Sequence, residues 1–286
     1  MAYQYLTEEN IHKFIKSALE EDIRDGDHSS LASIPRGTQN TAQLIIKDDG
    51  ILAGVKMVEY IFNAVDQNLK LEILKRDGET VKKGDIGLKV HGEASSILTA
   101  ERLVLNCLQR MSGIATYTHN LSQMIAHTST KLLDTRKTTP NFRLAEKWAV
   151  EIGGGKNHRF GLFDMIMLKD NHNDFAGGIT ASVTATKKYL KENNLDLRIE
   201  VETRNIEEVK EALEVGGVDV IMLDNMSVDQ MKKAIDLIGD KCQTEASGGI
   251  TESTIVKIAE TGVNFISVGA LTHSYKSLDI SLKAVS

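Results

Sequence analysis

The second half of the chain alternates short apolar runs with segments of helical period. Six such runs begin near residue 131, namely KLLDTRK, FDMIMLKDN, LRIEVETR, VDVIMLDN, QTEASGG and FISVGA. Between them, segments such as RLAEKWAVEI and SVDQMKKAIDLI repeat apolar residues every three or four positions. Strands that are apolar on both faces and separated by helices predict a parallel sheet covered by helices. Because no GxGxxG motif opens the series, we expect an α/β fold with an incomplete barrel of about six to seven parallel strands.

The first half of the chain has a different pattern. LTEENIHKFIKSALEED has the spacing of an amphipathic helix, and Thr7 is placed to be its N-cap. AQLIIKDDGILAG alternates around Asp49-Gly50, which predicts a hairpin. Residues 69–94 contain short strand-like runs broken by DG, KKG and HG, so we expect a β-rich module there.

A long helical run then leads to the predicted domain boundary. It extends over ILTAERLVLNCLQRMSGIATYTHNLSQMIAH, and we expect Gly113 to interrupt it. We therefore predict an N-terminal α/β sandwich domain over residues 1–113 and a catalytic barrel domain over 114–270. The amphipathic tail, 271–286, is predicted either to cap the barrel or to pack back on the first domain.

Composition narrows the class of ligand. The 286 residues carry a formal charge of -6, and the 26% of charged residues are interspersed in sign, which is not typical of a nucleic-acid-binding arm. The N-terminus lacks the apolar region of a signal peptide, and no apolar run reaches the length of a membrane span. Cys107 and Cys242 belong to no metal-type cluster, so we expect reduced, buried thiols. We expect a cytoplasmic protein whose partners include neither nucleic acid nor membrane.

Polar side chains follow each predicted barrel strand. In α/β barrels the carboxyl ends of the strands form the active face, so residues remote in sequence meet there. Four cations lie at these ends, with His158 as a candidate fifth, and the arginine forks suit carboxylates and phosphates. The cations are Arg136, Lys137, Arg159 and Lys169.

Acids and glycine turns complete the predicted site. Glu202 and Asp224 end successive strands and suit Mg²⁺ held jointly with a ligand's phosphates. Exposed backbone N–H groups in Ser247-Gly248-Gly249 and Gly269-Ala270 suit a phosphate. Together these features predict a small, highly anionic substrate pair.

Several of these residues also have purely structural interpretations. A single SGG can terminate a helix, and the glycines at 153–155 are first of all a helix stop. Asp170 and His172 can simply orient Lys169. We favour Glu200 as an internal ion-pair partner of a barrel lysine over a ligand role.

The motifs, taken in order, resemble those of a known family. DTRKTTP, LAEKWAVEIGGGKNHRFGL, MLKDNH, EVE, MLDN and ASGGI are similar to the motif series of quinolinate phosphoribosyltransferase, the carboxylating nicotinate-nucleotide pyrophosphorylase. ALEEDIRDGDHSS and ERLVLNCLQRMSGIAT extend the resemblance to the first domain. Asn141 stands where this family of type II phosphoribosyltransferases usually has Gly, and Asn tolerates a positive φ better than other non-glycine residues.

The resemblance implies a reaction and a set of residues. Quinolinate and 5-phosphoribosyl 1-pyrophosphate (PRPP) would give nicotinate mononucleotide, pyrophosphate and CO2, a step of NAD biosynthesis that requires Mg²⁺. Lys137, Lys169, Glu202 and Asp224 would be catalytic, and the last two would meet the metal directly or through PRPP. The implied family dimer, which can associate further, has Arg102 reaching into the partner's barrel. The full set of implied substrate-binding residues is Arg102, Thr135, Arg136, Lys137, His158, Arg159, Lys169, Glu202, Asp224, Ser247, Gly248, Gly249, Val268, Gly269 and Ala270.

Three alternatives stay open on the sequence alone. A nicotinate phosphoribosyltransferase would handle one carboxylate and show no decarboxylation. A barrel lyase would use Lys169 as a Schiff-base nucleophile. A protein that kept the fold and lost the chemistry would bind phosphate ligands without turnover.

Overall fold

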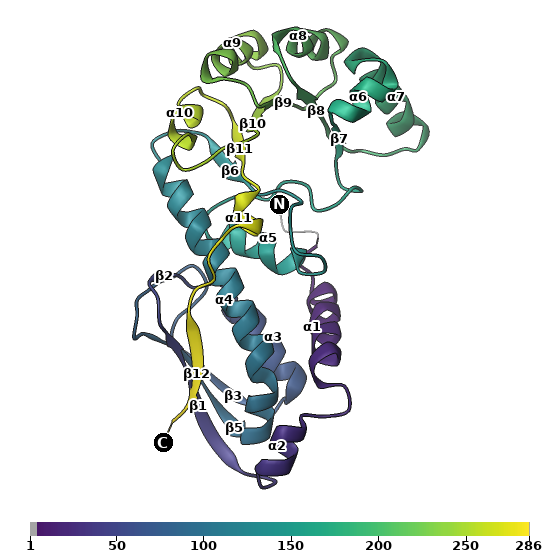
Figure 1. Ribbon diagram of the computed structural model, residues 1–286. Coiled ribbons are helices and arrows are strands. Elements are labelled where there is room, and N and C mark those ends of the chain that lie inside the picture. The colour runs from purple at the N-terminus through teal and green to yellow at the C-terminus, as the bar shows by residue number, and fades with distance from the viewer. Residues whose placement is uncertain (1–4, 286) are drawn as a thin grey trace. The chain divides into compact units, whose positions relative to one another are not determined.

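The chain forms two compact units in the computed structural model, which describes residues 5–285 (Figure 1). The first unit contains the chain up to His119, Lys137–Gly154 and the residues from Ala270 onward. The second unit contains Asn120–Arg136 and Gly155–Gly269. These limits differ from the predicted domain limits, because residues 114–119 and 137–154 belong to the first unit.

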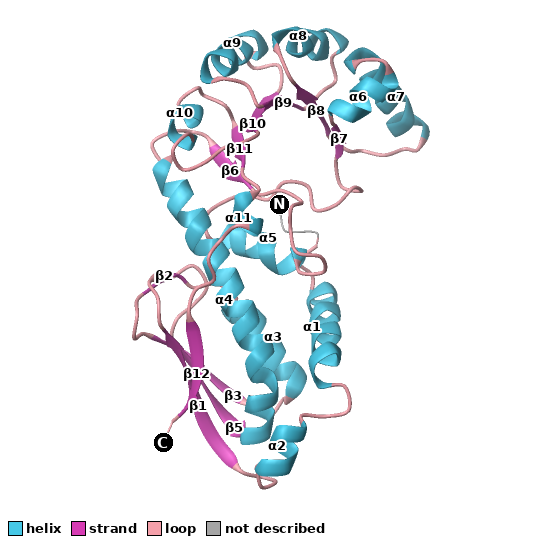
Figure 2. Cartoon of the chain, viewed as in Figure 1, coloured by secondary structure: helices cyan, strands magenta, loops and turns pink. Residues whose placement is uncertain are grey.

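The first unit combines helices with an antiparallel sheet (Figure 2). Helix α1 begins at the predicted cap, where the Thr7 hydroxyl accepts a hydrogen bond from the Asn10 N–H at 3.2 Å. The elements are α1 Glu8–Ile23, α2 His28–Ser33, β1 Gln39–Ile46, β2 Gly50–Ile51, α3 Val55–Val65, β3 Lys70–Ile73, β4 Thr80–Val81, β5 Ile86–Glu93, α4 Ala94–Met124, α5 Arg143–Ile152, α11 Ala270–His273 and β12 Ile280–Ala284.

The sheet of the first unit pairs β1 with β12, strands that are far apart in the sequence. Its strand order is β12-β1-β5-β3, and Ile46 of β1 pairs with Ile280 of β12. The tail therefore packs on this unit. The predicted hairpin around Asp49-Gly50 is wrong, because β1 pairs with β5 and β12, whereas β2 pairs with β4. The Asp49-Gly50 turn is therefore not flanked by two paired strands, because β1 pairs with strands that are more distant in sequence.

Helix α4 is continuous through Gly113, so the predicted interruption is also wrong. A Cβ at Gly113 would lie 2.3 Å from the Lys276 carbonyl oxygen and 2.9 Å from the Ser277 Cα. The glycine thus lets the tail pass close to the helix. Beside it, the Leu278 N–H donates to the Gln109 carbonyl at 3.0 Å.

The second unit contains all six predicted parallel strands. Helices α7, α8, α9 and α10 lie along the outer face of the curved sheet (Figure 1). The elements are β6 Lys131–Leu133, β7 Ile166–Leu168, α6 Asp170–Ala176, α7 Ile179–Glu192, β8 Ile199–Thr203, α8 Ile206–Val215, β9 Val220–Asp224, α9 Val228–Ile238, β10 Gln243–Ser247, α10 Ile255–Ala259 and β11 Phe265–Ser267.

The parallel strands form an open barrel in which β6 and β7 do not pair with each other. The order β6-β11-β10-β9-β8-β7 leaves β6 and β7 at the two edges, which confirms the incomplete barrel. A single parallel bridge between Leu133 and Lys156 extends the β6 edge, with the Lys156 N–H donating to the Leu132 carbonyl at 2.8 Å. The segment that follows Lys156 therefore starts along β6 before the chain reaches β7. No helix among residues 5–285 is long and apolar enough to cross a bilayer.

Candidate functional site

The carboxyl ends of the barrel strands bring Arg136, Arg159 and Lys169 to the same end of the barrel as the predicted acids and the glycine turn at 247–249. Asp224 at the end of β9 is in register with Ser247 at the end of β10. Glu202 pairs with Met222 one layer before that end. Because all neighbouring strands are parallel, Lys169 and Val268 follow β7 and β11 at the same edge.

Two arginines are half-buried at the carboxyl end of the barrel. Arg136 follows β6, and Arg159 lies in the segment between Lys156 and β7; both are half-buried. Burial lowers the pKa of Arg159, and the positive charge of Arg136 lowers it further. The Arg159 Nη1 also donates to the Met165 carbonyl at 3.1 Å. Like charges held together in a half-buried place are suited to a ligand with more than one negative charge.

Lys169 and the acid pair form a second group. The Lys169 Nζ lies 2.9 Å from Glu202 Oε2, and the Glu202 side chain is only 7% exposed. Burial raises the pKa of Asp224, and the negative charge of Glu202 raises it further. A cation between the two carboxylates would relieve this repulsion. The His172 Nδ1 accepts the Lys169 N–H at 3.0 Å, so His172 fixes the backbone from which Lys169 extends, as the structural interpretation expected.

The turn after β10 is built around Asn225. Gly248 and Gly249 have φ of 93° and 59°, values that favour glycine. Asn225, itself at φ 52°, donates its N–H to the Ser247 carbonyl at 2.9 Å. Its Nδ2 donates to Asp224 Oδ2 at 2.7 Å. Asn225 therefore connects the acid of β9 with the glycine turn of β10.

The remaining predicted residues are divided between the two units. The Val268 N–H donates to the Leu133 carbonyl at 3.0 Å, which ties the turn before Gly269 to β6. Thr135 is half-buried just before Arg136. Lys137 and Ala270 belong to the first unit, where the Thr272 hydroxyl donates to the Lys137 carbonyl at 2.8 Å. Arg102 is exposed on α4.

The loop after Lys137 is fastened by a buried glutamate within the first unit. Glu146 accepts the Thr139 N–H at 3.0 Å and a guanidinium hydrogen bond from Arg110 at 3.0 Å. The Arg110 guanidinium also lies 5.2 Å from the centre of the Phe142 ring. Asn141 adopts φ 62°, the conformation expected for the residue at the family's glycine position.

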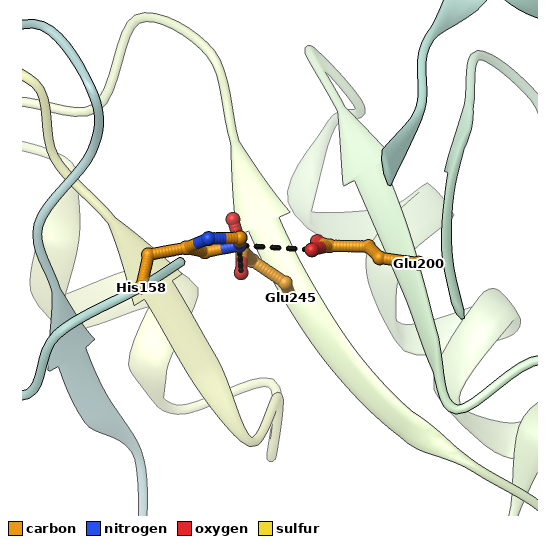
Figure 3. A group of neighbouring side chains, drawn as sticks. All are labelled: His158, Glu200 and Glu245. Carbon is orange, nitrogen blue, oxygen red and sulfur yellow. Dashed lines mark hydrogen bonds and ion pairs between the residues drawn. The ribbon is translucent and has the colours of Figure 1, made fainter. Parts of the chain in front are cut away.

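His158 lies inside the barrel with two glutamates (Figure 3). Its Nε2 is 2.8 Å from Glu200 Oε2 and 3.3 Å from Glu245 Oε2. The three side chains are 7%, 0% and 2% exposed. The expected ion pair of Glu200 with a lysine is wrong in its partner, which is His158.

This cluster holds more protons than a neutral imidazole with two free carboxylates would. Burial alone would lower the pKa of His158, but its hydrogen bonds to Glu200 and Glu245 and their charges raise it to about 10. Burial and the charge of Glu245 raise the pKa of Glu200 to about 7. The Arg159 N–H donates to the His158 Nδ1 at 2.7 Å, so that nitrogen accepts a hydrogen bond. Because Nδ1 accepts that hydrogen bond and carries no proton, the additional proton is best placed between the carboxylates of Glu200 and Glu245.

No role was predicted for Glu245 or Asn225, although both stand among the polar residues at the ends of predicted strands. One signal was available for the first: Glu200 and Glu202 are two residues apart and must face the same side of β8. A glutamate in the middle of another apolar strand, as in QTEAS, is the natural companion of such inward acids. Asn225 carried no comparable signal, because its role depends on a turn that lies 23 residues later in the chain.

An incomplete α/β barrel with paired guanidiniums, an acid pair and a glycine turn at one edge defines a binding site for anionic, phosphate-bearing ligands. The models of the N-terminal and C-terminal domains of quinolinate phosphoribosyl transferase match residues 27–112 and 114–283. The chain belongs to the quinolinate phosphoribosyltransferase family, as the motif resemblance predicted.

Individual relatives agree with this assignment. A chloroplastic nicotinate-nucleotide pyrophosphorylase (carboxylating) of Arabidopsis thaliana is 49% identical over 94% of this chain and 81% of its own length. A probable nicotinate-nucleotide pyrophosphorylase (carboxylating) of Bacillus subtilis is 42% identical over 95% of this chain and 92% of its own length. The solved NadC structure from Streptococcus pyogenes has a TM-score of 0.91 at 39% identity and covers 98% and 99% of the two chains.

Proposed function

We propose that this protein transfers the phosphoribosyl group of PRPP to quinolinate and releases CO2, giving nicotinate mononucleotide and pyrophosphate. The proposal rests on family membership and on one observation: Arg136 and Arg159 are both half-buried at the carboxyl ends of the barrel strands. Quinolinate carries two adjacent carboxylates, and two guanidinium forks match them in charge and in geometry. A substrate with one carboxylate, such as nicotinate, would leave part of this positive charge uncompensated.

Lys169 supplies a movable third charge in this scheme. Its side chain is 49% exposed, so its ammonium group can turn from Glu202 toward a substrate carboxylate or phosphate. The Schiff-base alternative would use Lys169 as the nucleophile and would leave the glycine turn at 247–249 and the acid pair without a role.

PRPP would occupy the acid pair and the glycine turns. Glu202 and Asp224 face developing positive charge on the ribose, while Ser247, Gly248 and Gly249 offer backbone N–H groups to the 5′-phosphate. Val268, Gly269 and Ala270 would add to the phosphate site, and Lys137 would meet the pyrophosphate.

Mg²⁺ suits the same acids. Glu202 and Asp224 would hold it together with the pyrophosphate of PRPP, where it would neutralise charge on the leaving group. The raised pKa of Asp224 beside Glu202 supports a cation at this place.

The chemistry divides between protein and substrate. Departure of pyrophosphate leaves an oxocarbenium-like ribose, so cations must stabilise the leaving group. Once the pyridine nitrogen is alkylated, its positive charge stabilises the carbanion left by CO2. The protein's share is to grip one carboxylate with arginine and keep the departing one poorly solvated.

We also propose a homodimer in which Arg102 enters the partner's barrel, with further association of dimers allowed. Exposure of Arg102 on α4 leaves it available for such a contact. A cytoplasmic location stays a prediction, and the name of the Arabidopsis relative shows that family members also occur in plastids.

The deciding experiment mixes purified protein with quinolinate, PRPP and Mg²⁺, and measures CO2 and nicotinate mononucleotide. We expect the two products in equal amounts, and no CO2 when nicotinate replaces quinolinate. Mononucleotide from nicotinate at a higher rate than from quinolinate would favour the one-carboxylate alternative. Absence of both products from correctly folded protein would refute the proposal.

A further inference from the structure

The ring of His158 is bound at both nitrogens by the protein itself. Nε2 faces the carboxylates of Glu200 and Glu245, here called the glutamate pair, at 2.8 and 3.3 Å (Figure 3). Nδ1 accepts the backbone N–H of Arg159 at 2.7 Å. A nitrogen that accepts an N–H carries no proton, so the proton of the neutral ring is on Nε2 and is donated to the glutamate pair.

This tautomer is incompatible with a metal ion in the cluster. His158, Glu200 and Glu245 have the donor types of a metal site, and their ligand atoms lie within 4.8 Å of one another. A metal at Nε2 needs the lone pair there and moves the ring proton to Nδ1. Nδ1 faces the Arg159 N–H, so that arrangement would set two donors against each other.

The backbone next to the ring is fastened as well. The His158 N–H donates to Asp134 Oδ1 at 2.8 Å, and the Asn157 amide donates to Asp134 Oδ2 at 2.8 Å. Asp134 is fully buried at the end of β6. The glutamate pair belongs to β8 and β10, and Asp134 follows β6. His158 therefore connects the residues just before Arg159 to three strands of the barrel.

Arg159 needs such fastening. Arg159 and Arg136 are both half-buried, the positive charge of Arg136 acts on Arg159, and like charges separate unless the surrounding structure holds them. Two buried carboxylates are also a costly way to fill a barrel, since apolar side chains of similar size are often more stabilising. The cluster therefore calls for a role other than stability.

We propose that His158 is a positioning residue: its neutral ring ties Arg159 to the glutamate pair and thereby fixes the guanidinium against one carboxylate of the substrate. This rests on the proposed function, and it changes the role that the family resemblance implied for His158. Neither ring nitrogen is available to quinolinate, so His158 acts through Arg159 and does not touch the diacid.

Two substitutions test the hydrogen bonds of the two ring nitrogens of His158 one at a time. The amide of asparagine can occupy the place of Nδ1, so His158→Asn keeps an acceptor for the Arg159 N–H but gives nothing to the glutamate pair. The longer glutamine reaches the place of Nε2, so His158→Gln keeps a donor for the glutamate pair but leaves the Arg159 N–H without an acceptor. Both should raise KM for quinolinate by about ten- to a hundredfold, with a smaller change in kcat, because misplacement of a substrate-binding group by about 1 Å has effects of that order.

A double-mutant cycle distinguishes positioning from contact. In an Arg159→Ala background, the further change His158→Gln should alter KM for quinolinate by less than about twofold, since the group that it positions is gone. KM for PRPP should change by less than about twofold in every His158 variant. Glu245→Gln, which keeps an acceptor oxygen, should rescue most of the affinity that Glu245→Ala loses.

The outcomes are distinct. An undiminished effect of His158→Gln in the Arg159→Ala background would mean direct contact and would overturn the inference. Calorimetry of the unmutated protein with quinolinate comes first: absence of binding and turnover would refute the proposed function, while leaving the ring geometry testable. That test is ¹⁵N NMR of the histidines, where we expect a neutral His158 ring with its proton on Nε2. A proton on Nδ1 would overturn the inference even if the His158 variants failed to fold.

Discussion

Gly248→Ala should disturb the site through its neighbour on the adjacent strand. The new Cβ would lie 2.3 Å from the Asn225 Oδ1 and 2.5 Å from its Cγ. The Asn225 amide is the end of a side chain and can swing away, so the collision itself costs little. What is lost is the hydrogen bond from the Asn225 Nδ2 to Asp224 Oδ2, now 2.7 Å long.

The magnitude has two parts. Alanine at the φ of 93° found for Gly248 costs roughly 1–2 kcal/mol. A hydrogen bond at an exposed position contributes about 0.5–1.5 kcal/mol. Gly249→Ala is a matched control, because Gly249 has φ 59° and no atom within 4 Å of an added Cβ. We expect Gly248→Ala to lower the free energy of unfolding by about 1 kcal/mol more than Gly249→Ala does.

Urea denaturation measures the stability difference, and calorimetry measures PRPP binding. Release of the Asp224 carboxylate should weaken PRPP binding by about tenfold, the equivalent of 1.4 kcal/mol, with quinolinate binding unchanged. Asn225→Gly tolerates the φ of 52° and removes the amide, so Gly248→Ala in that background should cost only the backbone term. Equal losses in both glycine variants, or an unreduced cost in the Asn225→Gly background, would refute this reasoning.

Three further predictions concern other parts of the molecule. Gly113→Ala should destabilise the protein by about 1–3 kcal/mol, because overpacking against the tail backbone outweighs the roughly 1 kcal/mol that alanine adds to helix propensity. As a control, Asn106→Ala on the exposed face of the same helix should be neutral or stabilising. Urea denaturation measures both. Glu200 binds its proton more tightly in the folded chain, so its contribution to stability is lost as pH rises from about 4.5 to about 7. Glu200→Gln should therefore gain on the order of 3 kcal/mol relative to the parent protein over that range, and a pH-independent difference would contradict this. Arg102→Ala and Lys137→Ala proteins, each nearly inactive, should recover partial activity after subunit exchange, and failure to complement in mixed dimers shown to form would place the site within one chain.

Local patterns were sufficient to predict most of the second unit. The six strands are three to five residues long and most of them are apolar, and the helices between them carry their own period and caps, such as Ser227 before α9. Parallel strands bring their ends to one edge whatever the details of packing. The positions of Glu202, Asp224 and the 247–249 turn on a common edge therefore follow from the strand assignments alone.

The errors arose where the decisive partner is distant in sequence. The turn at Asp49-Gly50 has the composition of a hairpin, but the neighbours of β1 come from β5 and β12. Gly113 has the composition of a helix breaker, but its missing side chain admits the tail. The partners of His158 were not predicted either, because nothing in its neighbourhood along the chain shows that the inward-facing Glu200 and Glu245 bind it. Each of these depends on tertiary contacts that propensity does not contain.

The pairing of β1 with β12 orders events during synthesis. Ile46 leaves the ribosome long before its partner Ile280, so the amino-terminal sheet must wait for the last strand while every strand of the barrel is being made. During that interval one edge of β1 lacks its neighbour and is open to pairing with strands of other nascent chains. The late arrival of β12 therefore leaves this edge unpaired until the barrel strands have been made, and chaperone binding there would protect the growing polypeptide.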